Sequence, residues 1–298
     1  MRYAIRCLVL FVLGLSQALA APCPPPGSTA SSLQALKAEG FVVAEDGERA
    51  RLAIALLDCL DSPDPVLRDG VAFEAWSTWL RAGHLDLATR QLALTVLQTR
   101  LAADAPQGEG FGKPFAALVL SELARSDRKQ AWLSPEQRAS LLDAGARYLE
   151  GIRDYRGFDA GEGWRHGVAH GADLMLQLAL NPALDRAQLD RINQAVARQV
   201  TPPGHAYIYG EPERLARPVL YGALRGLHAE ADWTAWFGAL AAPPEGGWRA
   251  AFASTEGLAR RHDLRAFLLA VHVEIADSKE PALMAMRPGL AAALASLQ

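Results

Sequence analysis

The chemically densest stretch of this sequence runs from Gly163 to Asp173 and holds two histidines and a carboxylate. On an α-helix, where successive residues are 100° apart, His166, His170 and Asp173 would lie within about 60° of one another. Apolar side chains would take roughly the opposite side of that helix, at Val168, Ala172, Met175 and Ala179. The spacing therefore predicts a two-faced helix whose polar edge looks into a shared hollow.

A metal site is one interpretation of the two histidines, because a four-residue step places His166 and His170 side by side on one helix face. Asp173 is seven residues beyond His166, about 10 Å along the axis, which is too far for one ion to reach all three. We predict no cofactor and keep a divalent ion such as zinc as an alternative. A third ligand would have to come from Asp69, Asp159, Glu162 or Glu211.

General-base catalysis is a second interpretation, in which His170 takes a proton and Asp173 accepts an N–H from the ring and orients it. An anionic substrate would then be held by arginines, with Arg165, Arg214 and Arg217 as candidates. No Gly-x-Ser-x-Gly elbow or phosphate-binding glycine loop occurs in the sequence. A metal-dependent or general-base hydrolase that uses His166, His170 and Asp173 is the alternative function.

The plainer interpretation makes the same side chains a hydrogen-bonded polar stripe that ties neighbouring helices together, with Trp164 packed at its mouth. Satisfied interior histidines are commoner than ligands, so we favour a binding or scaffold protein with a polar concave face over an enzyme. The residues expected on that face are Trp164, Arg165, His166, His170, Asp173, Glu211, Arg214 and Arg217.

The elements that position these residues are predicted to be helices throughout. Apolar residues recur at spacings of three and four after Ser28, and no long stretch alternates as a strand would. Breakers separate the helices, and Ser134-Pro135-Glu136-Gln137 carries a cap residue and a proline typical of a helix start. The predicted fold class is all-α: a helical-hairpin superhelix of the HEAT or armadillo kind, or a closed α/α toroid.

A faint internal repeat favours helical hairpins. The stretches that begin at Arg68 and Arg165 share Arg, Gly, Val, Ala and Ala in register, and related starts occur at Lys113, Arg217 and Arg261. Intervals of about 50 residues fit a two-helix unit. Chance similarity among alanine-rich helices is the alternative explanation.

The N-terminus has the features of an export signal. Arg2 and Arg6 precede an apolar run, and Ala18 and Ala20 occupy the small-residue positions before a cleavage site. We predict a signal peptide over residues 1–20, a Pro-rich segment with the first helix over 21–45, and one helical repeat domain over 46–298. The expected location is the periplasm or the exterior, with no stable membrane insertion after cleavage.

Two cysteines remain after cleavage of that signal, and in an oxidising compartment they are expected to pair. A Cys23–Cys59 disulfide would pin the Pro-rich N-terminus to the first long helix and stabilise the fold by roughly 3–4 kcal/mol on a chain-entropy model. Two free buried thiols are the alternative.

Charge excludes one class of partner. Lys and Arg number 30 against 33 Asp and Glu, giving a net charge of -3, and no run of like charge occurs. Nucleic acid is therefore not expected as a partner. The expected partner is a small molecule, a peptide or a protein of unknown identity.

Three short segments are similar to the bacterial DUF2785 family, a domain of unknown function. They are Asp154-Tyr-Arg-Gly-Phe158, Gly163-Trp-Arg-His166 and Ala169-His-Gly-Ala-Asp173, with weaker likeness at residues 62–69 and 213–216. The resemblance covers about Leu52 to Leu227. It implies no activity, substrate or catalytic residue.

Overall fold

The computed structural model describes residues 22–103 and 110–297, and the predicted signal peptide over 1–20 lies outside them. The described chain is helical apart from loops and one small antiparallel hairpin, β1 (Phe158–Asp159) with β2 (Gly163–Trp164). The all-α prediction is confirmed. Among these residues, no helix has both the length and the apolarity needed to cross a bilayer.

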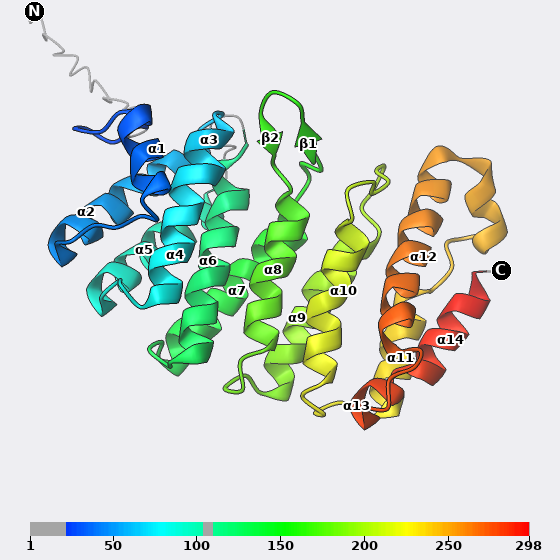
Figure 1. The fold of residues 1–298 in the computed structure, drawn as a ribbon. Helices are drawn as coiled ribbons and strands as arrows, with labels where there is room; N and C mark the ends of the chain where they lie inside the picture. The colour runs from blue at the N-terminus through cyan, green and yellow to red at the C-terminus, as the bar shows by residue number, and fades with distance from the viewer. Residues whose placement is uncertain (1–21, 104–109, 298) are drawn as a thin grey trace, which may run out of the picture.

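Most of the helices lie in two layers (Figure 1). Neighbours in one layer are α4 (Glu74–Ala82), α6 (Gly112–Lys129), α8 (Gly167–Ala179), α10 (Glu211–Ala223) and α12 (Thr255–Ile275). The second layer holds α5 (Leu87–Ala102), α7 (Pro135–Gly151), α9 (Arg186–Val200) and α11 (Glu230–Leu240). Because the chain alternates between layers, the helices of the first layer all begin at the end that carries β1 and β2.

The two ends of the array differ from its middle. The N-terminal end holds α1 (Ala30–Ala38), α2 (Asp46–Leu56), the short helices η1 (Asp58–Asp61) and α3 (Pro65–Leu67), and the π-helical turn η2 (Arg68–Phe73). At the other end, η3 (Trp248–Ala253) packs on α12, and α13 (Pro281–Met284) leads to α14 (Arg287–Ser296), which packs on α11 and α12. First and last helices lie at opposite ends (Figure 1), so the row is open and not a closed ring. Superhelical winding and the sequence repeat stay predictions.

Helix starts follow their local sequence. Ser134 accepts from the backbone N–H of Gln137 and Gln137 bonds back to Ser134, so α7 begins at Pro135 as the cap motif predicts. The core is aliphatic and aromatic: Trp76 and Trp79 are fully buried and donate to the carbonyls of Ala53 and Phe41. These indole contacts join α4 to the N-terminal helices.

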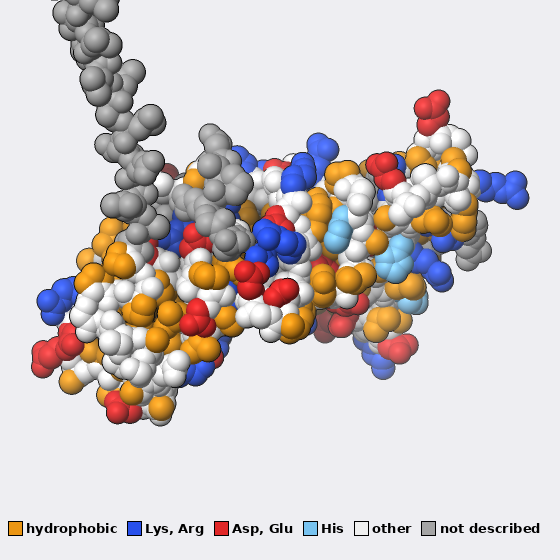
Figure 2. All heavy atoms as spheres, turned by 90° about the horizontal axis from the view of Figure 1, so that it is seen from above, with side chains coloured by type: hydrophobic (Ala, Val, Ile, Leu, Met, Phe, Trp, Pro, Cys, Tyr) orange, Lys and Arg blue, Asp and Glu red, His pale blue; other side chains and the backbone are white. Residues whose placement is uncertain are grey.

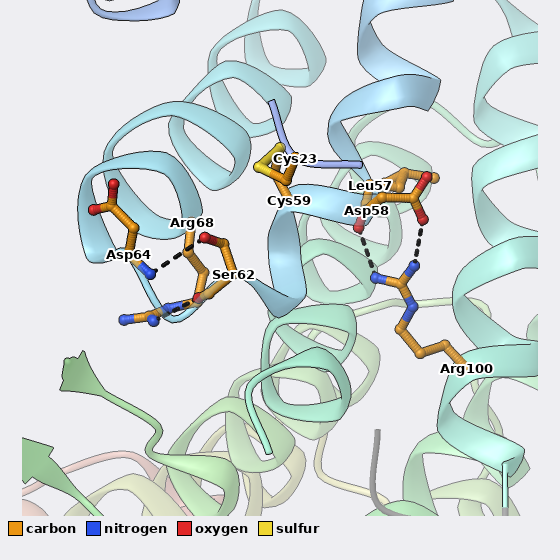
Figure 3. The surroundings of a disulfide bond; sticks show 8 residues. All are labelled: Cys23, Leu57, Asp58, Cys59, Ser62, Asp64, Arg68 and Arg100. Carbon is orange, nitrogen blue, oxygen red and sulfur yellow. Dashed lines mark hydrogen bonds and ion pairs between the residues drawn. A yellow bond between two sulfur atoms is a disulfide. The ribbon is translucent and has the colours of Figure 1, made fainter. Parts of the chain in front are cut away.

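Cys23 and Cys59 form the predicted disulfide (Figure 3). It fastens the start of the described chain to η1, the short helix after α2. Arg100 of α5 donates to the carbonyl of Leu57 at 2.6 Å and to Asp58 at 3.2 Å beside it. The disulfide therefore holds the N-terminal segment to η1, and the Arg100 contacts hold the start of η1 to α5.

Candidate functional site

The motif segment before α8 is a hairpin and not the start of a helix. Asp159 accepts the N–H groups of Gly161 and Glu162 at 2.8 and 3.0 Å, which closes the turn between β1 and β2. His166 has a left-handed backbone, φ 54°, and α8 begins one residue later. The helix predicted over 163–173 is therefore wrong for residues 163–166, because the turn and the strand pairing compete with helical hydrogen bonds.

The extended backbone sends consecutive side chains to opposite sides. The rings of Trp164 and His166 stack with their centroids 4.5 Å apart. Tyr209, in the loop before α10, meets Trp164 edge-on with ring centroids 5.7 Å apart. Arg165 goes the other way, and its guanidinium lies 4.3 Å from the centre of the Phe111 ring beside α6. The hairpin therefore places its side chains in two different regions of the molecule.

His166 is held by the loop before α10. Its Nε2 lies 3.2 Å from the carbonyl oxygen of Tyr209, so that nitrogen carries the proton and donates. Burial lowers the pKa of His166, and the nearby Arg214 lowers it further. The ring is therefore neutral at pH 7, with one nitrogen already used.

His170 lies one turn into α8 and is buried at 8% exposure. Its ring meets Phe115 of α6 edge-on, with centroids 5.0 Å apart, and its Nδ1 has no hydrogen-bond partner. Burial, followed by the charges of His166 and Arg214, lowers its pKa to about 3. A base this weak is a poor proton acceptor at neutral pH.

Asp173 pairs with Arg214 of α10 and not with His170. Arg214 donates from Nε to Oδ1 at 3.1 Å and from Nη2 to Oδ2, which occupies both carboxylate oxygens. The predicted His170–Asp173 hydrogen bond is wrong, because the guanidinium from the next helix takes the carboxylate. Burial raises the pKa of Asp173, opposed by Arg214.

Similar contacts join other neighbours in the same layer. Arg81 of α4 pairs with Glu122 of α6, and Arg128 of α6 donates to Gln177 of α8 at 3.1 Å. The Asp173–Arg214 pair continues this series to α10. These contacts match the interpretation of a polar stripe that ties helices together.

The carboxylates proposed as a third metal ligand are all engaged elsewhere. Glu162 accepts from Arg165 at 2.8 Å, Asp69 pairs with Arg68 at 2.7 Å, and the buried Glu211 accepts the Tyr209 N–H at 2.9 Å. Asp159 closes the hairpin turn. In the part of the chain that the structure describes, no three metal-ligating side chains converge. Zinc at His166 and His170 stays a prediction.

The remaining predicted arginine lies apart from the histidines. Arg217 is exposed on α10 and lines a groove of about 800 Å³ between α8, α10 and α12, with Leu176 and Leu269 among its apolar neighbours. The predicted binding residues therefore divide among a histidine cluster, a groove with Arg217 and the opposite side with Arg165.

A cavity on the Arg165 side was missed by sequence reasoning. It has a volume of about 580 Å³ and lies between the ends of α5 and α7 and the starts of α6 and α8. Its apolar lining includes Leu101, Pro114 and Ile152, and its basic lining is Lys113, Arg147, Arg153 and Arg165. In Figure 2, which looks down on this end of the molecule, basic and acidic side chains gather near the middle of the face.

Arg68 was also missed as a site residue, and it supports the hairpin from below. Its side chain is fully buried, its guanidinium lies 3.8 Å from the centre of the Phe111 ring, and it donates to the carbonyl of Glu162 at 2.7 Å. Both Arg68 and Arg165 thus contact Phe111. The one available signal was the sequence alignment of these two arginines.

Fold and site together define an all-α protein with two layers of helices and a motif hairpin at one end. A family model described as "Protein of unknown function (DUF2785)" matches residues 106–273, and the chain belongs to this family. The match includes the motif segments at 154–173 and 213–216 and not the one at 62–69. No curated protein and no solved structure matches the chain.

Proposed function

We propose that this protein is a non-catalytic binding protein whose ligand occupies the cavity between α5, α6, α7 and the start of α8. The observation that carries the proposal is the cavity of about 580 Å³ beside the family motif, with the buried Arg165 in its wall. Small-molecule sites are concave, mostly apolar and provided with a few polar groups, in a volume range of about 300–1,000 Å³. This cavity has those properties.

The groups around the cavity favour binding over catalysis. Burial raises the pKa of Tyr148, so its hydroxyl stays protonated, and it donates to the carbonyl of Gly167 at 3.3 Å. Among the lining residues that the structure describes, the carboxylate is that of Asp154, which pairs with Arg156. His166 contacts Tyr209, His170 packs on Phe115 of α6, and neither histidine is among the described residues that line the cavity. The described lining residues therefore present no acid and base as a pair to a bound molecule.

We also propose that the protein works outside the cytoplasm. The Cys23–Cys59 disulfide supports this location, because such bonds persist in the periplasm and outside the cell and are rare in the cytoplasm. Mass spectrometry of the protein recovered from the producing bacterium is expected to show a chain that begins at Ala21. A cytoplasmic chain that retains Met1 would contradict the proposal.

The binding proposal is tested by filling the cavity. Ala144 lines it from α7, and Ala139 is exposed on the same helix, so Ala144→Phe and Ala139→Phe add the same ring in different places. The probe is N-phenyl-1-naphthylamine, an uncharged dye that fluoresces when it enters an apolar site. The native protein and Ala139→Phe are expected to bind it, and Ala144→Phe is expected to lose at least about 90% of the signal, since the cavity is then blocked. Equal binding by both variants would refute the proposed site.

A further inference from the structure

We propose that the ligand is an amphipathic organic anion, with an apolar body and one acidic group. This inference rests on the proposed function and specifies its chemistry. The cavity is more apolar than polar, with Leu101, Ala144 and Ile152 in its lining. A purely polar anion would leave those side chains facing water and would gain nothing from them.

The charge of the wall is the first argument for an anion. Among the described residues, four basic side chains line the cavity, against the carboxylate of Asp154. Arg147 pairs with Asp143, Arg165 with Glu162, and Asp154 with Arg156. These pairs cancel to a first approximation, so the balance depends on Lys113 and Arg153.

Lys113 and Arg153 contact neutral acceptors. Lys113 donates to the carbonyl of Ala103 just after α5, and Arg153 donates to the carbonyls of Glu150 and Ile152 at the end of α7. These contacts cap two helix C-termini, each of which carries about half a negative charge. The two full positive charges therefore exceed what they neutralise by about one unit.

Helix direction adds to this excess. Both α6 and α8 begin at the cavity, where Lys113, Pro114 and Gly167 are lining residues. Each helix N-terminus carries about half a positive charge and unpaired N–H groups that favour an anion. One of these groups, the Gly112 N–H, is already taken by Asp61 at 2.7 Å. With that carboxylate counted, the described part of the cavity wall remains about one unit positive without a bound anion.

The placement of the basic side chains explains why the ligand needs only one acidic group. Arg165 is buried at 5% exposure, with its guanidinium fixed by Phe111 and Glu162, whereas Arg153 is exposed and Lys113 is partly buried. The Lys113 ammonium and the Arg153 guanidinium, which also line the cavity, suit the oxygens of a carboxylate, sulfonate or phosphate. The apolar body of the ligand would then lie against Leu101 and Ile152.

A matched pair of dyes tests the inference on the oxidised protein. The probes are 1-anilinonaphthalene-8-sulfonate, which has a naphthalene body and a sulfonate, and N-phenyl-1-naphthylamine, which lacks the acid. The sulfonate is expected to bind at least about tenfold more tightly, as one charge-assisted contact would give. Ala144→Phe is expected to abolish binding of both dyes, and Ala139→Phe is expected to preserve it.

Charge removal tests the assigned residues. Lys113→Gln/Arg153→Gln is expected to weaken sulfonate binding about tenfold and to change binding of the uncharged dye less than about twofold. Arg198→Gln/Lys279→Gln removes the same charge from exposed positions on other elements and should leave both affinities unchanged. Thermal unfolding of each variant checks that it is folded.

The outcomes separate the two proposals. If both dyes bind equally and only in the open cavity, the anion inference is overturned and the binding site stands. If neither dye binds the native protein, or if Ala144→Phe binds both as well as the native protein does, the proposed function is overturned too. A loss in the distant control equal to that in Lys113→Gln/Arg153→Gln would show general electrostatic attraction and overturn the residue assignment.

Discussion

Two regions beside one short segment differ in the space that they leave for a ligand. In the first region, His166 donates to Tyr209 in the loop before α10, Asp173 is paired with Arg214 of α10, and His170 packs on Phe115 of α6. In the second region, beside the start of α6, the buried Arg165 borders a cavity of about 580 Å³. The two histidines and Asp173 are thus engaged in contacts between helices, and the space for a ligand lies beside Arg165.

This difference teaches that residue type and spacing do not by themselves identify a site. Two histidines and an aspartate form a reactive set only when they face an open volume. Here they face neighbouring helices, where neutral rings and an ion pair stabilise contacts between elements. The following predictions test whether the two regions are as different as their contacts indicate.

The largest effect is expected from Arg68, which supports the cavity side. Arg68→Ala would leave the partly buried Asp69 and the Glu162 carbonyl without their donor and would uncover the Phe111 ring. We expect a loss of about 3 kcal/mol in the free energy of unfolding, measured by urea denaturation. Arg147→Ala, at an exposed position, is the control and should change it by less than about 0.5 kcal/mol. A loss under about 1 kcal/mol for Arg68→Ala would contradict its supporting role.

A smaller effect is expected on the histidine side, at Gly157. A methyl group there would overlap the ring of Tyr209, which also contacts Trp164 and provides the carbonyl for His166. Gly157→Ala is expected to cost about 2 kcal/mol of stability by overpacking and to preserve dye binding in the cavity. Gly47→Ala, whose added methyl meets nothing within 4 Å and which does not line the cavity, is the matched control. Loss of dye binding in a folded Gly157→Ala would show that the two regions are coupled.

The smallest effect, counted per pH unit, is the change in stability with pH that is due to His170. The folded chain keeps this ring neutral down to about pH 3, whereas its ordinary pKa is 6.5, so the unfolded chain binds more protons between these values. This contribution to stability is complete above pH 6.5 and is lost as the pH falls, by up to about 1.4 kcal/mol per pH unit. Urea denaturation at pH 7, 5.5 and 4.5 measures it.

His170→Leu tests that assignment, since leucine packs on Phe115 without a titrating group. Its stability is expected to fall less steeply than that of the native protein between pH 6.5 and 4.5. His84→Gln changes an exposed ring and is the control. Parallel pH curves for the native protein and His170→Leu would show that the buried ring does not titrate as proposed.

Much of the fold follows from local sequence. The spacing of apolar residues predicts helices, Ser134 and Pro135 mark the start of α7, and the two cysteines left after residue 20 pair as expected. These features depend on neighbours in the chain or on simple pairing. The hairpin was missed because the stretch from Gly163 to His166 is interpreted as the start of a helix, although a glycine with positive φ ends such a pattern.

The candidate site could be predicted only in part. The motif segment and its residues were found, and Trp164 does pack on His166. The pairing of Asp173 with Arg214 joins residues 41 positions apart, and the cavity joins residues from Leu101 to Gly167. Contacts between residues so far apart in the chain leave no periodic pattern in the sequence. The partner of Asp173 and the position of the cavity could therefore not be predicted from the sequence.

The sequence alone determined that this protein is helical, that its family motif is centred on residues 154–173, and that Cys23 has Cys59 as its partner. Periodicity, capping and cysteine count are properties of the chain itself. Only the tertiary structure decided that Trp164 and His166 face α10 while Arg165 faces α6, and that the cavity lies with Arg165. The reason is physical: a side chain's partner is set by which distant helix packs beside it, and no local pattern encodes that choice.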